Sequence, residues 1–548
     1  MMEMIKKISI IGIIILLSLS TFSFGTHSIK GDNIEGHWYG KEDEQYTKSY
    51  PTYGSLSGRI TDVFNNPIRN VRVRVYFHDL YAEDYTDGFG QYYVAAIPIC
   101  YCLKEVIVQK EGYEPISKMM TIKNTIKNFT LSPKNIIYVD DNGTSEYSTI
   151  QNAVDNATNQ STVYVYNGTY FENVRINKPI LLQGESKYKT IIDGGGTCDV
   201  VYVGSDDVTI SGFTISNSGE LYDNAGIDLN SYNNTVIDNI IKNNENDGVN
   251  IVIHSGNIIL KNTFSKNRDG IFLYQSTNNH VIDNVFISDG INLFGFFLDH
   301  YNSHRIENNT ADGKLIRYYK NSRNVTIPKE TAQVILVNCS HFIIQNLTIS
   351  HVPIGVQLSY SSNNLIQNNN ILSVQDGILL EESSNNLIKN NRIGNTHSHG
   401  IAFSKLSARN EINGNRITES HWNGISLFSI SNNNTITKNN ISNTKEKGLF
   451  LTSLCSENLI YKNNFINNSK NAIDLGTNMW DNGRIGNYWD DYKKEHQFAH
   501  KKLFRPWIWN KPYEIIGNQN YDYFPLSLPY SEDNIIFILS EFIQNIFN

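Results

Sequence analysis

A short pattern of apolar positions returns at regular intervals through the middle of the chain. Each copy begins with glycine and carries apolar residues at the second and fourth positions, as in Gly377-Ile378-Leu379-Leu380. Copies of this glycine motif begin at residues 226, 248, 270 and 290 and, after an interruption, at 355, 377, 400, 424 and 448, and Ala472 opens a last one. The spacings of 22, 22 and 20, then 22, 23, 24, 24 and 24 residues predict a solenoid with one coil per repeat.

The order of residues inside each repeat predicts strands. A second apolar run follows the glycine motif, with the pattern Asn-x-x-Ile-x-x-Asn-x-Ile, as in the segment from Asn386 to Ile393. Apolar and polar residues alternate, and no repeat holds the ten or so periodic positions that a helix needs. We therefore predict an all-β chain in which residues 136–477 form a right-handed parallel β-helix, with coils about 4.8 Å apart.

Asparagine recurs at one place in the repeat, two residues before an isoleucine or phenylalanine. We expect these side-chain amides to stack on successive coils and to hydrogen-bond along the axis. The positions are Asn239, Asn262, Asn284, Asn369, Asn391, Asn415, Asn439 and Asn463.

The N-terminal part has a different composition. Residues 1–25 are typical of a signal peptide, because Lys6 and Lys7 precede an apolar run that ends in small residues. An uncleaved membrane anchor is the alternative, and both place the bulk of the chain outside the cytoplasm, as a secreted, periplasmic or cell-surface protein. Residues 26–52 are polar and are predicted to be a linker.

Residues 53–132 are predicted to form an N-terminal β-sandwich. Alternating strands such as Val71 to Val75 are separated by turns such as Thr86-Asp87-Gly88. The order of these motifs resembles the carboxypeptidase regulatory-like domain, a prealbumin-like sandwich, and this implies a non-catalytic module. After it, residues 147–154 are predicted to form a short helix that caps the first coil, because an open solenoid end would template aggregation.

The repeats themselves resemble a known family. The opening coils, the Asn-Asn-x-Ile-x-x-Asn repeats and the closing run from Gly486 to Tyr492 are similar to the NosD-type β-helix family of the pectin-lyase-like superfamily. The resemblance implies an extracytoplasmic protein that handles copper, and it assigns 478–530 to an aromatic capping segment. The chain departs from the family at Glu495–Trp509, which is basic and aromatic rather than acidic, and this weakens calcium as a ligand. Residues 531–548 are a tail that is too short to span a bilayer.

Composition excludes some classes of function. The 548 residues carry a net charge of −8 and show no basic stripe, so nucleic acid is not an expected partner. The five cysteines show no zinc spacing, and we interpret them as small apolar core residues.

Four aspartates precede glycines of the motif. Asp247, Asp269, Asp289 and Asp376 should align as a column of carboxylates on successive coils. Aspartate before glycine is also ordinary turn chemistry, which is the alternative explanation. Glycoside hydrolases need carboxylates about 5–9 Å apart, so a cluster converging on a groove would favour a polysaccharide hydrolase or lyase. No catalytic residue is assigned.

A histidine pair is the candidate metal site. His397 and His421 each stand three residues before a motif glycine, and His399 lies on the same rim. We expect the pair to stack on adjacent coils, about one strand spacing apart, which suits a bridged metal. A surface ladder without metal is the alternative, and the few methionines offer no Met/His cluster for Cu(I).

The interruption at Asn302–Thr331 gives the main binding hypothesis. Outgrowths of this length from a regular solenoid are often functional. The run Arg317, Tyr318, Tyr319 and Lys320 combines hydrogen-bond donors with flat aromatic faces, which suit sugars; a local brace is the alternative.

Together these observations predict a secreted or cell-surface β-helix protein with a non-catalytic binding or scaffolding role. The expected partners are extracellular polysaccharides or cell-surface proteins, with a membrane contact only through an uncleaved N-terminal segment. The alternatives are a polysaccharide hydrolase or lyase, and an extracytoplasmic copper-handling protein.

Overall fold

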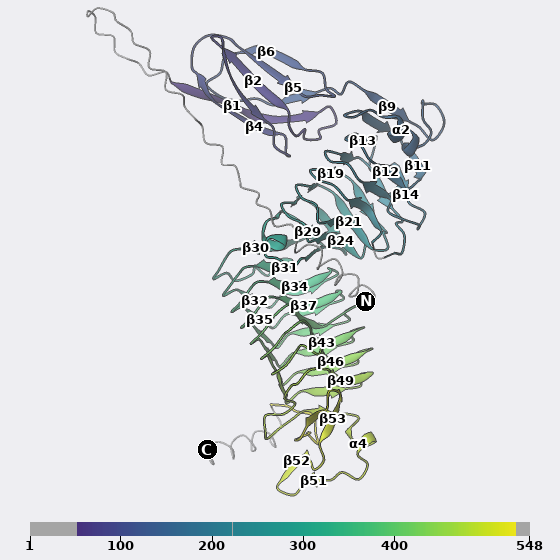
Figure 1. Ribbon diagram of the computed structural model, residues 1–548, viewed down its shortest axis with the longest axis vertical. Coiled ribbons are helices and arrows are strands. Elements are labelled where there is room, and N and C mark those ends of the chain that lie inside the picture. The colour runs from purple at the N-terminus through teal and green to yellow at the C-terminus, as the bar shows by residue number, and fades with distance from the viewer. Residues whose placement is uncertain (1–51, 222, 533–548) are drawn as a thin grey trace, which may run out of the picture. The chain divides into compact units, whose positions relative to one another are not determined.

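The computed structural model describes residues 52–221 and 223–532, so the predicted signal peptide, the linker up to residue 51 and the tail from residue 533 lie outside the described residues (Figure 1). The described chain is all-β apart from three short helices, α2 (Ile150–Asn156), α3 (Asp299–Asn302) and α4 (Tyr492–Glu495). None of its helices is long and apolar enough to cross a membrane.

The segment 53–131 forms two four-stranded sheets that enclose a core of their own. Alternation explains the core of this segment. Along β2, Val73 and Val75 are fully buried, whereas the alternating Arg72 and Arg74 are partly exposed. The sandwich predicted from the turn spacing is therefore present. Its strands are β1 (Tyr53–Asp62), β4 (Gln91–Pro98), β7 (Asn124–Ile126) and β8 (Phe129–Leu131) in one sheet, and β3 (Leu80–Tyr85), β2 (Arg72–Phe77), β5 (Lys104–Gln109) and β6 (Ile116–Met120) in the other.

The cysteines differ in part from the prediction. Cys339 and Cys455 are buried apolar residues, as expected. Cys100 and Cys102 instead form a disulfide, and Cys198 is exposed. Two cysteines separated by one residue point to the same side of an extended chain, which brings their sulfur atoms together.

The predicted cap helix is present as α2, and it covers the first coils. Ile150, Ala153 and Val154 point into the solenoid core. Thr149 is at the N-cap but its side chain does not bond the helix. The carboxylate of Glu172, one coil further on, accepts the backbone N–H groups of Ile150 and Gln151 at 2.8 Å instead.

The solenoid consists of two blocks of parallel coils that meet at the interruption. The first block runs from β9 to β29 and the second from β30 to β49. One sheet, the long sheet, passes through both blocks: β11 (Gly168–Phe171), β14 (Thr190–Asp193), β17 (Thr214–Ser216), β20 (Ile240–Lys242), β23 (Thr263–Ser265), β26 (Val285–Ile287), β29 (Thr310–Ala311), β30 (Lys314–Lys320), β31 (Thr331–Val337), β34 (Ile354–Ser359), β37 (Asp376–Glu381), β40 (Ile401–Ser404), β43 (Asn423–Leu427), β46 (Lys447–Leu451), β49 (Lys470–Asp474), β53 (Tyr513–Gly517) and β54 (Asn520–Asp522).

Four further sheets complete the coils. An eight-stranded sheet of the first block holds β9 (Ile136–Val139), β10 (Thr162–Val165), β13 (Leu181–Gly184), β16 (Thr209–Ser211), β19 (Thr235–Ile237), β22 (Ile258–Leu260), β25 (His280–Ile282) and β28 (Arg305–Glu307). The six-stranded sheet of the first block holds β12 (Val174–Ile176), β15 (Val201–Val203), β18 (Ala225–Leu229), β21 (Asp247–Val252), β24 (Asp269–Tyr274) and β27 (Ile291–Phe294).

The second block has two sheets of its own beside the long sheet. One holds β32 (Ile343–Gln345), β35 (Leu365–Gln367), β38 (Leu387–Lys389), β41 (Glu411–Asn413), β44 (Thr435–Thr437) and β47 (Leu459–Tyr461). The other holds β33 (Thr348–Ser350), β36 (Asn370–Leu372), β39 (Arg392–Gly394), β42 (Arg416–Thr418), β45 (Asn440–Ser442), β48 (Asn464–Ile466) and β50 (Tyr488–Trp489).

The motif glycines are not turn residues. Gly248 and Gly377 lie inside β21 and β37, and neither has a positive φ. Glycine is needed because coils approach closely there: a Cβ on Gly377 would lie 2.3 Å from the carbonyl oxygen of Gly400. Left-handed corners fall on polar residues instead, such as Asn243 (φ 54°) and Asn395 (φ 52°).

The asparagine ladder is confirmed, but it is broken into two. In each ladder the backbone N–H of one asparagine donates to the side-chain oxygen of the next, one coil further on, at 2.8–3.0 Å. These buried amides also donate to backbone carbonyls, so the corners of the coils are satisfied inside the core. The first ladder is Asn239, Asn262, Asn284 and Asn309, and the second is Asn369, Asn391, Asn415, Asn439, Asn463 and Asn487.

The break comes from a tight hairpin that changes the phase of the repeat. Strands β29 and β30 are antiparallel and joined at Asp312-Gly313, both with positive φ. In the first block the strands that carry the glycine motif belong to the six-stranded sheet, whereas in the second block they belong to the long sheet. The six-stranded sheet therefore ends at β27. Side-chain amides cap its open edge: Gln333 bonds both backbone groups of Ile291, and Gln357 bonds the carbonyl of Leu293.

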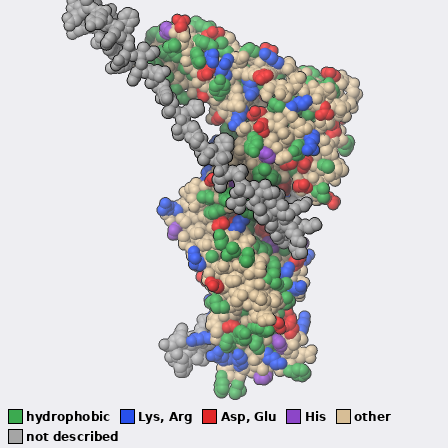
Figure 2. All heavy atoms as spheres, in the orientation of Figure 1, with side chains coloured by type: hydrophobic (Ala, Val, Ile, Leu, Met, Phe, Trp, Pro, Cys, Tyr) green, Lys and Arg blue, Asp and Glu red, His purple; other side chains and the backbone are tan. Residues whose placement is uncertain are grey.

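The aromatic segment after residue 478 closes the other end. Trp489 stacks on Phe465 of the last coils at 4.6 Å and on Tyr513 at 4.2 Å between ring centroids. Strands β51 (Lys501–Lys502) and β52 (Arg505–Trp509) form a hairpin in this segment. Hydrophobic and Lys/Arg side chains gather over this end of the solenoid (Figure 2).

Candidate functional site

A cleft of about 800 Å³ lies where the two blocks meet. One wall comes from the corners of the first block around residues 267–269 and 288–292, and the other from corners of the second block at residues 351–353, 373–376 and 397–398, with Trp422. The phase change creates this arrangement, because β27 is the last strand of its sheet and the second block starts beside it. Of the four predicted aspartates, Asp269, Asp289 and Asp376 line the cleft.

Asp247 and Asp269 lie side by side on β21 and β24. Burial, followed by the neighbouring Asp269 carboxylate, raises the pKa of Asp247 well above its usual range. Burial also raises the pKa of Asp269, while Arg268 and hydrogen bonds from Asn292 and Gln375 oppose this. Two like charges this close disfavour each other's ionised form, which adds to the effect of burial on Asp247.

Asp289 does not continue this column. The coil that contains it is two residues shorter at the corner, since Phe264 pairs with Phe286 but Ile271 with Ile291. Asp289 therefore takes the ladder position and accepts the backbone N–H and side-chain amide of Asn267 at 3.1 and 2.8 Å. Burial raises the pKa of Asp289 to about 8.

Asp376 reaches the cleft from the opposite wall. It begins β37 in the second block, and its carboxylate accepts the backbone N–H of His399 at 2.9 Å. The preceding residue, Gln375, crosses to the first block and donates to the Asp269 carboxylate at 2.7 Å and to the Arg268 carbonyl at 2.6 Å. Asp269, Asp289 and Asp376 are thus gathered at one cleft from two walls, and only Asp247 and Asp269 stack as a column.

Apolar surface accompanies these polar groups. Val352, Pro353 and Val374 line the cleft, and the indole of Trp422 is 46% exposed at its rim. Trp422 packs edge-on against the ring of His399 at 5.5 Å. A flat aromatic face beside hydrogen-bonding groups is the usual composition of a small-molecule or sugar site.

The candidate histidines divide into two kinds. His397 and His421 are exposed on adjacent coils, with ring centroids 5.8 Å apart. His399 is buried, its ring nitrogen lies 3.1 Å from the Ser426 hydroxyl, and burial lowers its pKa.

The aromatic run of the interruption forms β30 and binds to its own chain. The hydroxyl of Tyr318 donates to the carbonyl of Tyr301, and the ammonium of Lys320 donates to the carbonyls of Asn302 and His304. Tyr319 packs edge-on against Phe342 at 5.3 Å, and Arg317 pairs with Val334 on β31. The polar ends of Tyr318 and Lys320 are thus engaged within the fold, as in the brace alternative.

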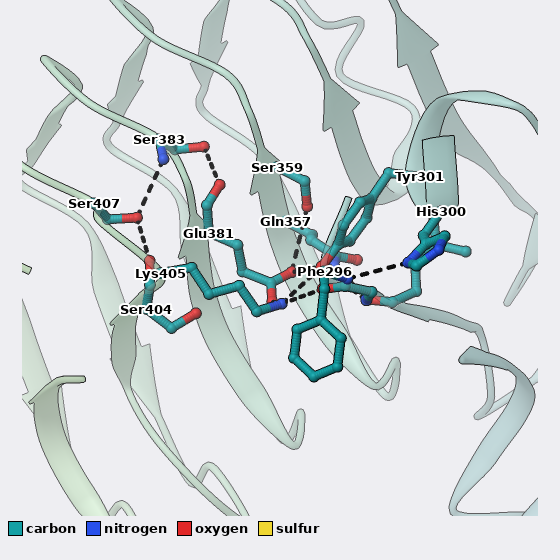
Figure 3. A network of polar contacts seen from close by, with 12 residues as sticks. Phe296, His300, Tyr301, Gln357, Ser359, Glu381, Ser383, Ser404, Lys405 and Ser407 are labelled. Carbon is teal, nitrogen blue, oxygen red and sulfur yellow. Dashed lines mark hydrogen bonds and ion pairs between the residues drawn. The ribbon is translucent and has the colours of Figure 1, made fainter. Parts of the chain in front are cut away.

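A buried polar network, absent from the sequence predictions, holds the loop between β27 and α3 against the second block (Figure 3). Glu381 on β37 is 1% exposed and forms an ion pair with Lys405. The hydroxyl of Tyr301 donates to Glu381 at 3.0 Å and lies 2.9 Å from the Lys405 ammonium. The network fixes the loop that follows β27, the last strand of the six-stranded sheet.

Sequence reasoning also missed Arg268, Gln375 and Trp422. Two signals were available: Arg268 stands next to an aspartate of the column, and Trp422 follows His421 within the same corner. Gln375 gave no signal, since its partner is 106 residues away in the chain.

Residues 180–332 match the family model of the right handed beta helix region. With the parallel sheets, this match defines the class of protein: a right-handed parallel β-helix. Residues 312–494 match the model described as periplasmic copper-binding protein (NosD). This part of the solenoid is therefore similar to the NosD-type right-handed β-helix family.

Solved structures share low identity with this chain. The catalytic domain of a GH87 α-1,3-glucanase in complex with nigerose is 12% identical over 78% of this chain and 89% of its own, with a TM-score of 0.28. Pectin methylesterase from carrot is 14% identical over 46% and 81%, with a TM-score of 0.27. The Bacillus anthracis TIE protein is 15% identical, and the match spans 17% of this chain and 20% of that protein, with a TM-score of 0.14. No curated protein matches the chain.

The family description raises the question of copper. His397 and His421 present two imidazoles, whereas Cu(II) prefers a tetragonal set of nitrogen and oxygen donors. Within residues 52–221 and 223–532, no group of three His, Cys, Asp or Glu side chains is placed to hold a metal ion. His397 and His421 therefore supply two of the donors that Cu(II) prefers.

Proposed function

We propose that this protein binds a neutral carbohydrate chain, outside the cytoplasm, in the cleft between its two blocks. The extracytoplasmic location agrees with the description of its family as periplasmic. The supporting observation is the pairing of an exposed indole, Trp422, with amide, carboxyl and guanidinium groups across one cleft. Sugar rings stack on aromatic faces through their C–H groups and hydrogen-bond through their hydroxyls.

The protonation of the cleft favours a neutral ligand. With a pKa of about 8, Asp289 is protonated at neutral pH and can donate a hydrogen bond as well as accept one. Arg268, which lines the cleft, already contacts the Asp247 carboxylate at 3.5 Å and Asp269 at 3.9 Å. An acidic polymer would meet carboxyl groups on both walls and a guanidinium that is already engaged with Asp247 and Asp269.

The test is affinity electrophoresis of the protein in gels that contain neutral glucans or mannans, with pectate and alginate as acidic comparisons. We expect retardation by a neutral polymer, and Trp422→Ala should weaken it by about tenfold or more. Tyr232→Ala is the matched control, because Tyr232 is 44% exposed and does not line the cleft. Equal retardation of the Trp422→Ala variant, or retardation by acidic polymers alone, would contradict the proposal.

A second candidate function is hydrolysis of such a chain. The observation that favours it is the approach of Asp269, Asp289 and Asp376 to one cleft, since glycoside hydrolysis uses one protonated and one ionised carboxyl group. New reducing ends released from a bound polymer, and lost in Asp376→Asn, would support this function. Binding of the polymer without release of new reducing ends would contradict hydrolysis and support binding as the function.

A further inference from the structure

The hairpin at the C-terminal end of the solenoid exposes large apolar side chains. Leu503 and Phe504 occupy the turn between β51 and β52 and are 86% and 88% exposed. Phe498, on the segment that leads into the hairpin, is 89% exposed. Single exposed apolar side chains are common on protein surfaces, but three of them on one short segment form a patch that marks an interaction surface.

Cations surround this apolar tip. Lys501 and Arg505 flank the turn and are exposed, and Lys493, Lys494 and Lys511 are exposed on the neighbouring segments. Between residues 493 and 511 there are six lysines and arginines, counting Lys502, against one acidic residue, Glu495. None of the six forms an ion pair with a carboxylate in the part of the chain that the structure describes.

The hairpin stands on a rigid base. Ile508 is fully buried with Leu526, Ile485 and Tyr530. Backbone bonds from Trp509 to Pro525 and from Ser527 to Trp507, both 2.8 Å, hold β52 in place. Only the turn projects from this base. Its apolar side chains are therefore held outward without a covering element of the described fold.

We propose that this hairpin docks the protein on an anionic lipid surface, with Leu503, Phe504 and Phe498 entering the interfacial region and the surrounding cations facing lipid headgroups. Basic side chains gain from the negative surface potential of such a membrane, and apolar side chains gain from leaving water. A soluble polyanion such as a nucleic acid would use the cations but would leave the apolar tip in water. The combination of both features favours the membrane.

The experiment is co-sedimentation of the full-length protein with vesicles of phosphatidylcholine alone and of phosphatidylcholine with phosphatidylglycerol. We expect stronger binding to the anionic vesicles, and salt should weaken it. The double variant Leu503→Ser/Phe504→Ser should bind them about tenfold or more weakly, because two large side chains no longer enter the interface. The double variant Lys501→Ala/Arg505→Ala should lose about tenfold on anionic vesicles only.

Controls separate the hairpin from the rest of the chain. Phe171→Ser removes a side chain that is 77% exposed on β11, and it should bind like wild type. All variants keep the apolar stretches 8–19 and 535–547, so any contribution of these stretches to vesicle binding is the same in every variant. Vesicle binding unchanged by the Leu503→Ser/Phe504→Ser substitutions would overturn the proposal. So would a protein that ignores vesicles but binds dextran sulfate equally with and without those substitutions.

Discussion

Replacing Asp289 by asparagine tests how the cleft affects stability. Asp289 ends a ladder through Asn244 and Asn267 in which the other members are amides. Asparagine keeps an oxygen that accepts the Asn267 N–H, and it carries no charge. We therefore expect Asp289→Asn to stabilise the protein at neutral and alkaline pH, where the wild-type carboxyl must hold its proton or bury a charge.

The magnitude follows from the pKa of Asp289, which burial raises from its usual 3.8 to about 8. Below about pH 4 the carboxyl is protonated in both the folded and the unfolded state. The free energies of unfolding of the wild type and the variant should therefore differ least there. As the pH rises, the unfolded state releases its proton first, and the wild type loses stability until the folded carboxyl also ionises near its own pKa. A difference of about four pKa units corresponds to about 5 kcal/mol as an upper bound, with most of it present at pH 7.

The assay is urea denaturation followed by circular dichroism at about pH 4, 6 and 8. Midpoints are compared between the two proteins, because coil arrays do not always unfold in one step. Other buried carboxyls such as Asp228 and Asp522, each with a pKa raised to about 7, titrate in both proteins and cancel in the comparison. A midpoint difference that is constant across the pH range would refute the reasoning.

Three further predictions concern the ladder, the buried ion pair and the histidines. Asn415→Ala should lower the free energy of unfolding by about 3 kcal/mol, measured by denaturation, because Asn391 loses its acceptor inside the core. Lys405→Met should cost about 3–5 kcal/mol in the same assay by leaving Glu381 buried and unpaired, and Glu381→Gln in the same chain should restore most of the loss; no recovery would contradict the network. In a calorimetric copper titration, His397→Ala should weaken binding by about tenfold or more if the imidazole pair is the site, and unchanged or absent binding would remove copper from this rim.

Local periodicity predicted the coils because each coil is specified by its own residues. The glycine motif marks where neighbouring coils approach closely, and the ladder asparagines satisfy the corners of the coils. Both features depend on neighbours about 22–24 residues away. The fold class follows from the same signal and the cap helix from a short helical pattern, whereas the aromatic end of the solenoid was implied by the family resemblance.

The cleft could not be predicted in this way. It depends on which sheet a strand joins after the β29–β30 hairpin, and nothing in the glycine motif itself records that its strands change sheets there. The shortened corner before Asp289 is visible in the sequence as a spacing of 20 residues. Its effect on the ladder can be predicted only when the register of the neighbouring strands is known. Tyr318 and Lys320 were plausible ligands by composition. Their polar ends have a structural use only because the carbonyl groups of Tyr301, Asn302 and His304 lie within reach.

The break between the two ladders divides the solenoid into modules that can change length independently. Within each ladder, every coil presents the same amide to the next, so a whole coil gained or lost there would leave the ladder closed on both sides. At the junction, Gln333 and Gln357 cap one particular strand edge, and no other coil could take its place. Duplication or loss of repeats could thus change the distance from the cleft to either end of the solenoid and leave the walls of the cleft unaltered.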